Sequence, residues 1–93
     1  MSESLRVVEV CNRQGLHARP CHAVVSIANR FSGELRVRCG PRDVNAKSIL
    51  ELMTLNACCG STLELRARGD GAEAVLDELE QLIVSGFGEH PAD

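Results

Sequence analysis

The chain has 93 residues, a formal net charge of −3, 44% hydrophobic residues and 25% charged residues, which is typical of one small globular domain. The negative charge and the absence of Trp and Tyr argue against a nucleic-acid-binding surface, which normally combines a basic stripe with aromatic rings. No apolar run approaches the ~20 residues of a membrane span, and the first residues do not resemble a signal peptide. We expect a single domain over residues 1–93 in the cytoplasm, with no nucleic-acid or membrane partner.

The first half of the chain alternates between strand and helix patterns. Residues 5–10 are rich in Val and predict a strand. From Pro20 to Phe31 the apolar residues follow helical spacing, and Gly33 is expected to stop this helix. Apolar and charged residues alternate from 34 to 39, which predicts a strand with one exposed face. A turn at 40–43 and a short strand at 44–46 would complete a hairpin.

The second half adds a short helix, a strand and a longer helix. Ser48 with Glu51 three residues later is a capping-box signature, so a helix is expected over 49–55. Residues 62–68 alternate again, and a long helical period follows them, ending near residues 86–89. The polar tail over 89–93, which contains His90, is expected to be frayed.

The predicted order is therefore β-α-β-β-α-β-α. Four strands and three helices indicate an α+β fold in which three helices pack on one face of a four-stranded antiparallel sheet. The pattern alone does not separate an open-faced β-sandwich from a ferredoxin-like arrangement.

The most informative stretch, Gly15-Leu16-His17-Ala18-Arg19-Pro20, places a histidine where a loop enters a helix. A lone histidine at such a place is usually a polar cap or a surface residue. Here Gly15 permits a tight loop, and Pro20 puts the helix start at or just after His17. The first N–H groups of a helix lack partners within it, and its dipole is positive there. A phosphate on His17 would meet those N–H groups with Arg19 nearby.

This stretch resembles the active-site motif of the HPr family, the histidine-containing phosphocarriers of the bacterial phosphoenolpyruvate-dependent phosphotransferase system. The segment from Val44 to Leu55 resembles the regulatory-serine segment of that family. A turn at Gly69-Asp70-Gly71, followed by the last helix, is a weaker match. The resemblance spans residues 5–89 in the order of the family and implies an HPr-like open-faced β-sandwich.

The resemblance also implies a mechanism and partners. His17 would accept a phosphoryl group at Nδ1 from enzyme I and pass it to a sugar-specific enzyme IIA component or its nitrogen-branch equivalent. Arg19 would stabilise the charge of the phosphate, and Ala18 would offer a backbone N–H to it. The protein would be a monomeric carrier without a cofactor or a metal, with a phosphohistidine intermediate, rather than a stand-alone catalyst.

Two further features concern regulation and docking. Ser48 is either a helix cap alone or, as the resemblance implies, also a target of HPr kinase/phosphorylase. The predicted docking patch consists of four apolar residues, of which Leu50 is expected to be the most exposed: Leu16, Ile49, Leu50 and Met53. Glu51 departs from the glycine or lysine that is usual in HPr, so the partners stay open. The nitrogen-branch paralogue NPr is the nearest alternative.

Three rival classes of protein are considered, of which one, an interaction module that has lost phosphoryl transfer, is disfavoured by the presence of His17 itself. His17 and Cys21 are spaced four residues apart on one helix and could share a metal ion, but two ligands fall short of the four in a structural zinc site. The five cysteines form no C-x-x-C pair, and an odd number cannot all be paired internally. A stand-alone enzyme would need a carboxylate or a substrate pocket beside His17, and no Asp or Glu lies near it in sequence.

Overall fold

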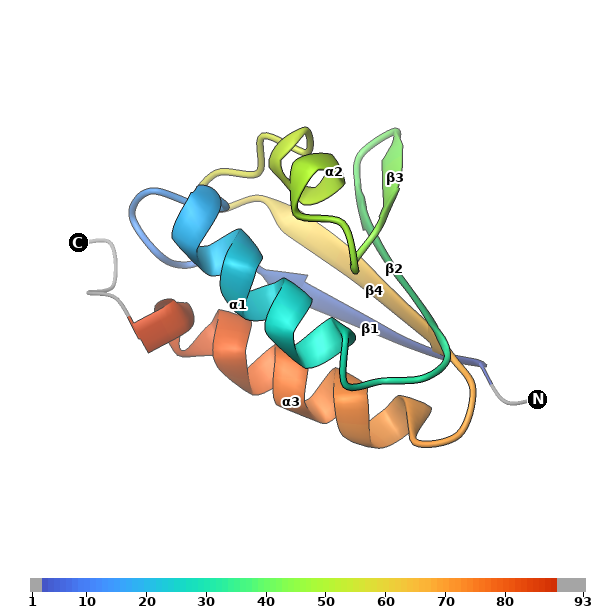
Figure 1. The fold of residues 1–93 in the computed structure, drawn as a ribbon. Helices are drawn as coiled ribbons and strands as arrows, with labels where there is room; N and C mark the ends of the chain where they lie inside the picture. Colours follow the sequence, from blue (N-terminus) through green and yellow to red (C-terminus); the bar gives the residue numbers. More distant parts are fainter. Residues whose placement is uncertain (1–2, 89–93) are drawn as a thin grey trace.

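The computed structural model describes residues 3–88 as two layers, a sheet and the helices that cover one of its faces (Figure 1). The elements are β1 (Glu3–Glu9), α1 (Ala18–Ala28), β2 (Glu34–Cys39), β3 (Arg42–Asn45), α2 (Ile49–Met53), β4 (Thr62–Arg68), α3 (Ala72–Val84) and the 3₁₀ turn η1 (Gly86–Gly88). All strand pairs are antiparallel, in the order β1-β4-β2-β3 across the sheet. The predicted element order and sheet are confirmed. Within residues 3–88, no helix is both long and apolar enough to span a membrane.

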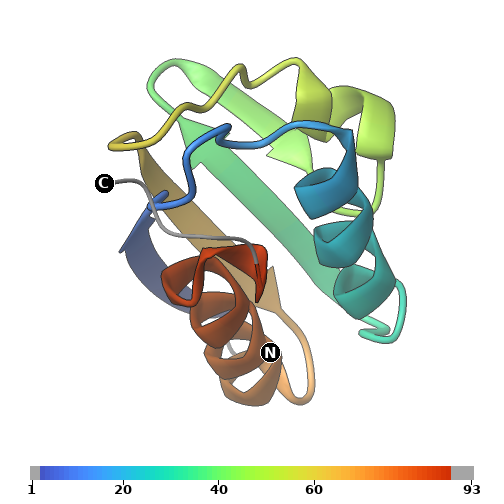
Figure 2. The same ribbon diagram turned by 90° about the vertical axis from the view of Figure 1, so that its left-hand side faces the viewer.

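The core lies between the sheet and the helices. Strand β4 turns Leu63, Leu65 and Ala67 inward, and all three are buried, as the alternation of its sequence predicts. Helix α3 faces them with a stripe that includes Leu76 and Leu79, neither of which is exposed. Figure 2 shows the helices gathered on the same side of the sheet. The core therefore has one sheet face and one helix layer, which leaves the other sheet face to solvent.

That open face carries both apolar and charged side chains. Leu5 and Val7 of β1 are 53% and 56% exposed. Their register places Leu5 opposite Arg66 of β4, which in turn lies opposite Arg36 of β2. Both arginines contact the carboxylate of Asp43 on β3. The shared carboxylate separates two like charges that would otherwise repel each other across adjacent strands.

Ion pairs fasten α3 to the first strand. The guanidinium of Arg6 on β1 contacts the carboxylates of Glu73 at 2.9 Å, Asp77 at 2.7 Å and Glu80 at 2.7 Å. The hydrogen bonds to Asp77 and then Glu80 raise the pKa of the Arg6 guanidinium above its usual value. The edge strand and the acidic helix are thus joined by charge as well as by apolar packing.

Gly33 does not stop the first helix, contrary to the prediction. Helix α1 ends at Ala28, with Asn29 as its C-cap. A Cβ built on Gly33 would lie only 2.1 Å from the carbonyl oxygen of Arg68. The glycine is therefore needed where the start of β2 passes close to the end of β4.

Several other boundaries differ from the prediction, including both ends of β1, which spans Glu3–Glu9 instead of 5–10. Strand β3 begins at Arg42, because the turn before it uses only Gly40 and Pro41. Helix α2 ends at Met53, two residues before the predicted end. Phe87 lies beyond α3, in the turn η1, with a positive φ of 59°. The predicted frayed tail, including His90, lies outside the described residues.

Candidate functional site

His17 is the N-cap of α1. Its backbone is extended, with φ −87° and ψ −172°, and its side chain makes no capping hydrogen bond to the helix. The first intrahelical bond runs from the N–H of Cys21 to the carbonyl of His17, at 3.1 Å. Before it come Ala18 and Arg19, for whose N–H groups the helix has no acceptor, and Pro20, which has no N–H. The predicted helix start is confirmed, and two backbone donors lie directly after His17.

The loop before His17 is shaped by a glycine. Gly15 has a φ of +65°, and a Cβ on it would lie 2.3 Å from the carbonyl oxygen of Ala57. The same carbonyl accepts a hydrogen bond from the N–H of Leu16 at 2.9 Å. The loop between β1 and α1 therefore rests on the loop between α2 and β4, and the two run near each other in Figure 2. Only glycine fits this combination of backbone angle and close contact.

Asn12 is a site residue that the sequence reasoning missed. It is completely buried, and its Nδ2 donates to the carbonyl of Gly15 at 2.8 Å. The N–H of Gly15 returns a hydrogen bond to the carbonyl of Asn12 at 3.2 Å. The sequence did contain a signal for this role, because the side chain of an Asn before a turn often forms hydrogen bonds to nearby backbone groups. Asn12 fixes the loop that presents His17.

The electrostatics of this helix start favour an anion. Helix α1 has no acidic residue in its first turn, so its positive end keeps its full field. Arg19 is exposed at the second helical position and adds a mobile positive charge. His22, one turn further along α1, is also exposed. The arrangement can hold a phosphate on His17 with backbone N–H groups and one guanidinium.

The predicted docking patch is only partly accessible. Leu50 is 75% exposed and Met53 41% exposed, whereas Ile49 packs partly against the core. Leu16 is only 6% exposed, so its inclusion in the patch is wrong. Its side chain belongs to the core, and its backbone N–H donates to the carbonyl of Ala57. Helix α2 contacts α1, so the exposed pair of the patch belongs to the element beside His17.

Ser48 is a helix cap, as predicted. Its Oγ accepts a hydrogen bond from the N–H of Glu51 at 3.2 Å. The carboxylate of Glu51 accepts from the N–H of Asn45 at 3.0 Å, three residues before the cap rather than at Ser48 itself. Ser48 is partly exposed, so the cap does not seal it from solvent.

The geometry does not support a shared metal site at His17 and Cys21. Cys21 is fully buried, its Sγ lies 3.7 Å from the carbonyl oxygen of Leu16, and burial raises the pKa of its thiol. Over residues 3–88, no group of three or more His, Cys, Asp and Glu side chains is placed to hold a metal ion. Cys21 is an apolar core residue of α1.

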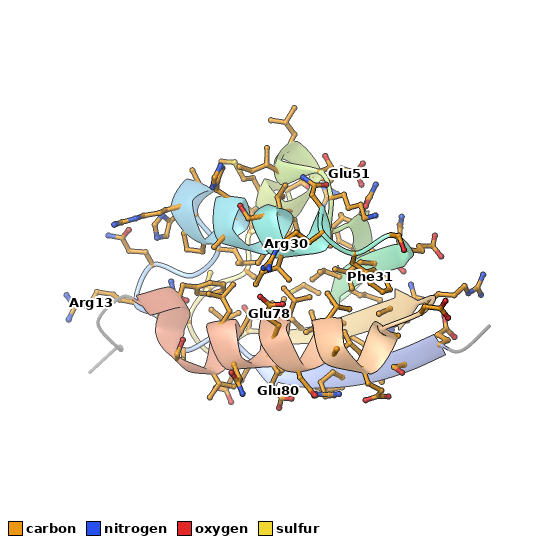
Figure 3. All side chains as sticks on the ribbon, turned by 60° about the horizontal axis from the view of Figure 1, so that its bottom comes forward. Arg13, Arg30, Phe31, Glu51, Glu78 and Glu80 are labelled. Carbon is orange, nitrogen blue, oxygen red and sulfur yellow. The ribbon has the colours of Figure 1, made fainter. Side chains whose placement is uncertain are left out.

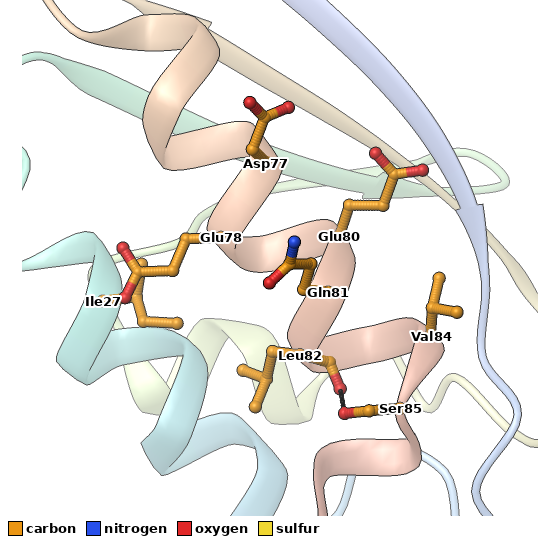
Figure 4. Close-up of a pocket in the computed structure, with 8 residues that line it drawn as sticks. All are labelled: Ile27, Asp77, Glu78, Glu80, Gln81, Leu82, Val84 and Ser85. Atoms are coloured by element: carbon orange, nitrogen blue, oxygen red, sulfur yellow. Dashed lines mark hydrogen bonds between the residues drawn. The ribbon is translucent and has the colours of Figure 1, made fainter.

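A hollow of about 890 Å³ lies along α3, away from His17. Asp77, Glu78 and Glu80 line it from α3, and Ile27 lines it from α1 (Figure 4). Arg30 pairs with Glu78 at 2.7 Å, and Figure 3 shows these two side chains between the helices. None of the residues around His17 lines this hollow, so it gives no substrate pocket to a stand-alone enzyme centred on that histidine.

The matched family model, described as "PTS HPr component phosphorylation site", covers residues 5–85. The chain belongs to the HPr family. It is 40% identical over 85 residues to phosphocarrier protein HPr of Treponema pallidum, which covers 91% of this chain and 97% of the relative. It is 34% identical over 89 residues to phosphocarrier protein NPr of Shewanella violacea, covering 96% and 98%. The HPr-family crystal structure of HPr-C-His from Thermoanaerobacter tengcongensis matches with a TM-score of 0.87 and 40% identity, covering 97% and 99%.

These similarities confirm the HPr-like open-faced sandwich and the phosphocarrier family. They do not separate the two branches of the family, because relatives named HPr and NPr both match nearly the whole chain.

Proposed function

We propose that this chain accepts a phosphoryl group on His17 from phospho-enzyme I and passes it to a downstream component of the phosphotransferase system. The observation that carries the proposal is the position of His17, at the N-terminus of α1 and inside the matched residues 5–85. We assign the protein to the cytoplasm as a monomer. Its acceptor is a sugar-specific enzyme IIA component or the nitrogen-branch equivalent.

The transfer needs a nucleophile and a place for charge. The lone pair of the neutral imidazole Nδ1 attacks phosphorus, and the bond from phosphorus to the donor breaks with its electrons leaving on the donor. Charge builds on the phosphoryl oxygens during this step. The N–H groups of Ala18 and Arg19, with the dipole of α1, are aimed at that charge before the reaction begins.

The same contacts are weak enough to let the group leave. Arg19 is exposed, so water and salt screen its attraction to the phosphate. A carrier that buried the phosphate among several arginines would bind it too tightly to pass it on. The open helix start instead allows transfer in both directions, which a carrier requires.

Incubation with phosphoenolpyruvate and a bacterial enzyme I tests the proposal. We expect an acid-labile, base-stable phosphate on the wild-type protein. His17→Ala should remove it and leave the fold intact, because the half-buried side chain gives α1 no capping hydrogen bond. His22→Ala, an exposed histidine of the same helix, is the matched control and should be labelled normally. Labelling that persists in His17→Ala would disprove the assignment.

We also propose that Ser48 is a regulatory phosphorylation site for an HPr kinase/phosphorylase. Its hydroxyl is partly exposed and caps α2, next to exposed Leu50. A phosphate there adds up to about two negative charges beside the carboxylate of Glu51. It would weaken docking of a partner on Leu50 and Met53. Incubation with the kinase and ATP, followed by peptide mass analysis, tests this role, with Ser48→Ala as the control.

The choice between the two branches depends on the acceptor. Glu51 is exposed and lies between the apolar residues Leu50 and Met53 in the sequence, which puts an acidic side chain at the rim of the patch. Parallel transfer assays with a sugar-specific and a nitrogen-branch enzyme IIA would separate the branches. Glu51→Lys should change the ratio of the two rates, because charges at a docking rim mainly change association rates.

A further inference from the structure

Two of the five cysteines differ from the others in exposure. All five lie within the described residues, and all are free thiols. Cys21 is buried and Cys11 and Cys39 are partly buried, whereas Cys58 and Cys59 are exposed and adjacent in the chain. Thiol oxidation follows exposure and is favoured where a second thiol stands ready to resolve the first product. Cys58 and Cys59 are therefore the two cysteines whose thiols are most accessible to an oxidant.

The pair lies in the loop that supports the His17 loop. Ala57, immediately before the pair, provides the carbonyl that holds Leu16 at 2.9 Å. A Cβ on Gly15 would lie 2.8 Å from the Cα of Cys58, so the two backbones are in contact. Any change in the backbone around Cys58 is transmitted directly to the residues before His17.

The local hydrogen bonds show how the loop is held in the reduced protein. The N–H of Cys58 donates to the Oγ of Ser61 at 3.0 Å. The N–H of Ser61 donates to the carbonyl of Cys58 at 2.9 Å. Both bonds use the backbone of the first cysteine of the pair, so they depend on the conformation of the Cys58–Cys59 peptide.

We propose that Cys58 and Cys59 are a site of reversible oxidation, and that their disulfide slows phosphoryl acceptance at His17; this second part rests on the proposed function. The oxidant is hydrogen peroxide or an organic hydroperoxide. The first thiolate attacks the peroxide, breaks its O–O bond and becomes a sulfenic acid, with release of water or alcohol. The second thiol attacks that sulfur, forms the S–S bond and expels water. In total the two thiols lose two protons and two electrons, and the peroxide is reduced to two molecules of water, or to one of water and one of alcohol.

The adjacency of the two cysteines makes this disulfide a labile one. Neighbouring Cα atoms are about 3.8 Å apart, which is shorter than the usual span of about 4.4–6.8 Å in disulfides. The eight-membered ring strains the Cys58–Cys59 peptide, and strained, exposed disulfides are the easily reduced ones. The strain acts on the carbonyl of Cys58 that holds Ser61 and on Ala57 beside it. Oxidation thus moves the support of the His17 loop, and reduction restores it.

The experiment treats the full chain with stoichiometric hydrogen peroxide and removes the peroxide before enzyme I and phosphoenolpyruvate are added. We expect a loss of two hydrogen atoms in the peptide that contains Cys58 and Cys59, reversed by dithiothreitol. The initial rate of His17 phosphorylation should fall at least about threefold and recover on reduction, since displacing a reacting group by about 1 Å can cost up to about 100-fold.

Two variants supply the controls. The double variant Cys58→Ser/Cys59→Ser should be phosphorylated at the same rate before and after peroxide. Cys39→Ser removes a partly buried thiol and should respond as wild type does. An oxidised pair with an unchanged rate would overturn the coupling, and oxidation that instead joins two chains would overturn the site. Absence of labelling in the reduced protein would overturn the proposed function, whereas the mass measurement judges the disulfide independently.

Discussion

The starts of α1 and α2 are built alike but finished differently. Both N-cap residues have extended backbones, with ψ −172° at His17 and ψ 112° at Ser48. Ser48 caps its helix through Oγ, and Glu51 puts a carboxylate in the first turn. His17 gives its helix no such cap, and the first turn of α1 contains no acid. The first N–H groups of α2 thus include one that a side chain caps, whereas α1 has no side-chain cap.

This difference has a cost in local stability. A side-chain cap stabilises a helix by about 1 kcal/mol, and α1 does without it. The loss is offset by backbone contacts before the helix, where Gly15 and Leu16 rest on Ala57. The helix start is held from outside, so its own donors stay available. Each of the following variants changes the start of α1 or the start of α2.

The largest effect is expected from Gly15→Ala. The new methyl group would meet the carbonyl oxygen of Ala57 at 2.3 Å and hold a φ of +65°. The free energy of unfolding should fall by about 2–4 kcal/mol, because left-handed strain and overpacking add. Urea denaturation measures it. Gly40→Ala is the matched control, since its φ is +61° but nothing lies within 4 Å; it should lose only about 1–2 kcal/mol. Equal losses would show that the contact with Ala57 does not matter.

Arg19→Ala should slow phosphorylation of His17 without abolishing it. The backbone N–H groups remain, so the barrier to phosphorylation should rise by about 1.5–3 kcal/mol at most, the range for a hydrogen bond to a charged group. Initial rates with enzyme I measure the change in both directions of transfer. Arg13→Ala, an exposed arginine of the preceding loop, is the control. Identical rates in the two variants would mean that Arg19 does not contact the phosphate.

The two substitutions of Ser48 separate its cap from its regulatory role. Ser48→Ala should lose about 1 kcal/mol of stability through the missing bond to the N–H of Glu51, yet accept phosphate on His17 at the normal rate. Ser48→Asp can still cap α2, but its charge should slow docking to enzyme I. Thermal unfolding and initial rates are both measured. If Ser48→Asp is phosphorylated as fast as wild type, Ser48 is a cap and nothing more.

The smallest change in stability is expected from Ala18→Asp, which gives α1 the acidic first turn that α2 already has. Ala18 is exposed, so the carboxylate needs no space in the core. It should stabilise α1 by about 0.3–1 kcal/mol through the helix dipole. The same charge should repel the incoming phosphoryl group and slow labelling of His17. Ala18→Asn, of similar size and uncharged, is the control; slowing of equal size in both would point to shape instead of charge.

The parts of the fold that depend on local pattern could be predicted from the sequence. Alternation along residues 62–68 matches β4 residue for residue. Ser48 caps α2 as expected, although the carboxylate of Glu51 bonds to Asn45 and does not complete the capping box. The start of α1 followed from Gly15 and Pro20, because both residues restrict the backbone on their own. The element order then needed only the count and spacing of such patterns.

The parts that depend on contacts between distant segments could not be predicted. Leu16 looked like a docking residue but is buried, and its loop contacts Ala57, which lies far along the chain. Gly33 looked like a helix stop but is a close approach to Arg68. Composition and spacing contain no information on such approaches.

The pairing of β1 with β4 has a consequence for folding during synthesis. Glu3 pairs with Arg68 and Glu9 with Thr62. Strand β1 therefore cannot pair until β4 has been synthesised. Closing that long loop is slow compared with forming a local hairpin. The carbonyl of Ala57, which accepts the hydrogen bond from the N–H of Leu16, is also synthesised after His17. A nascent chain that already displays His17 would therefore be a poor phosphoryl acceptor, and labelling at that histidine would report that folding is complete.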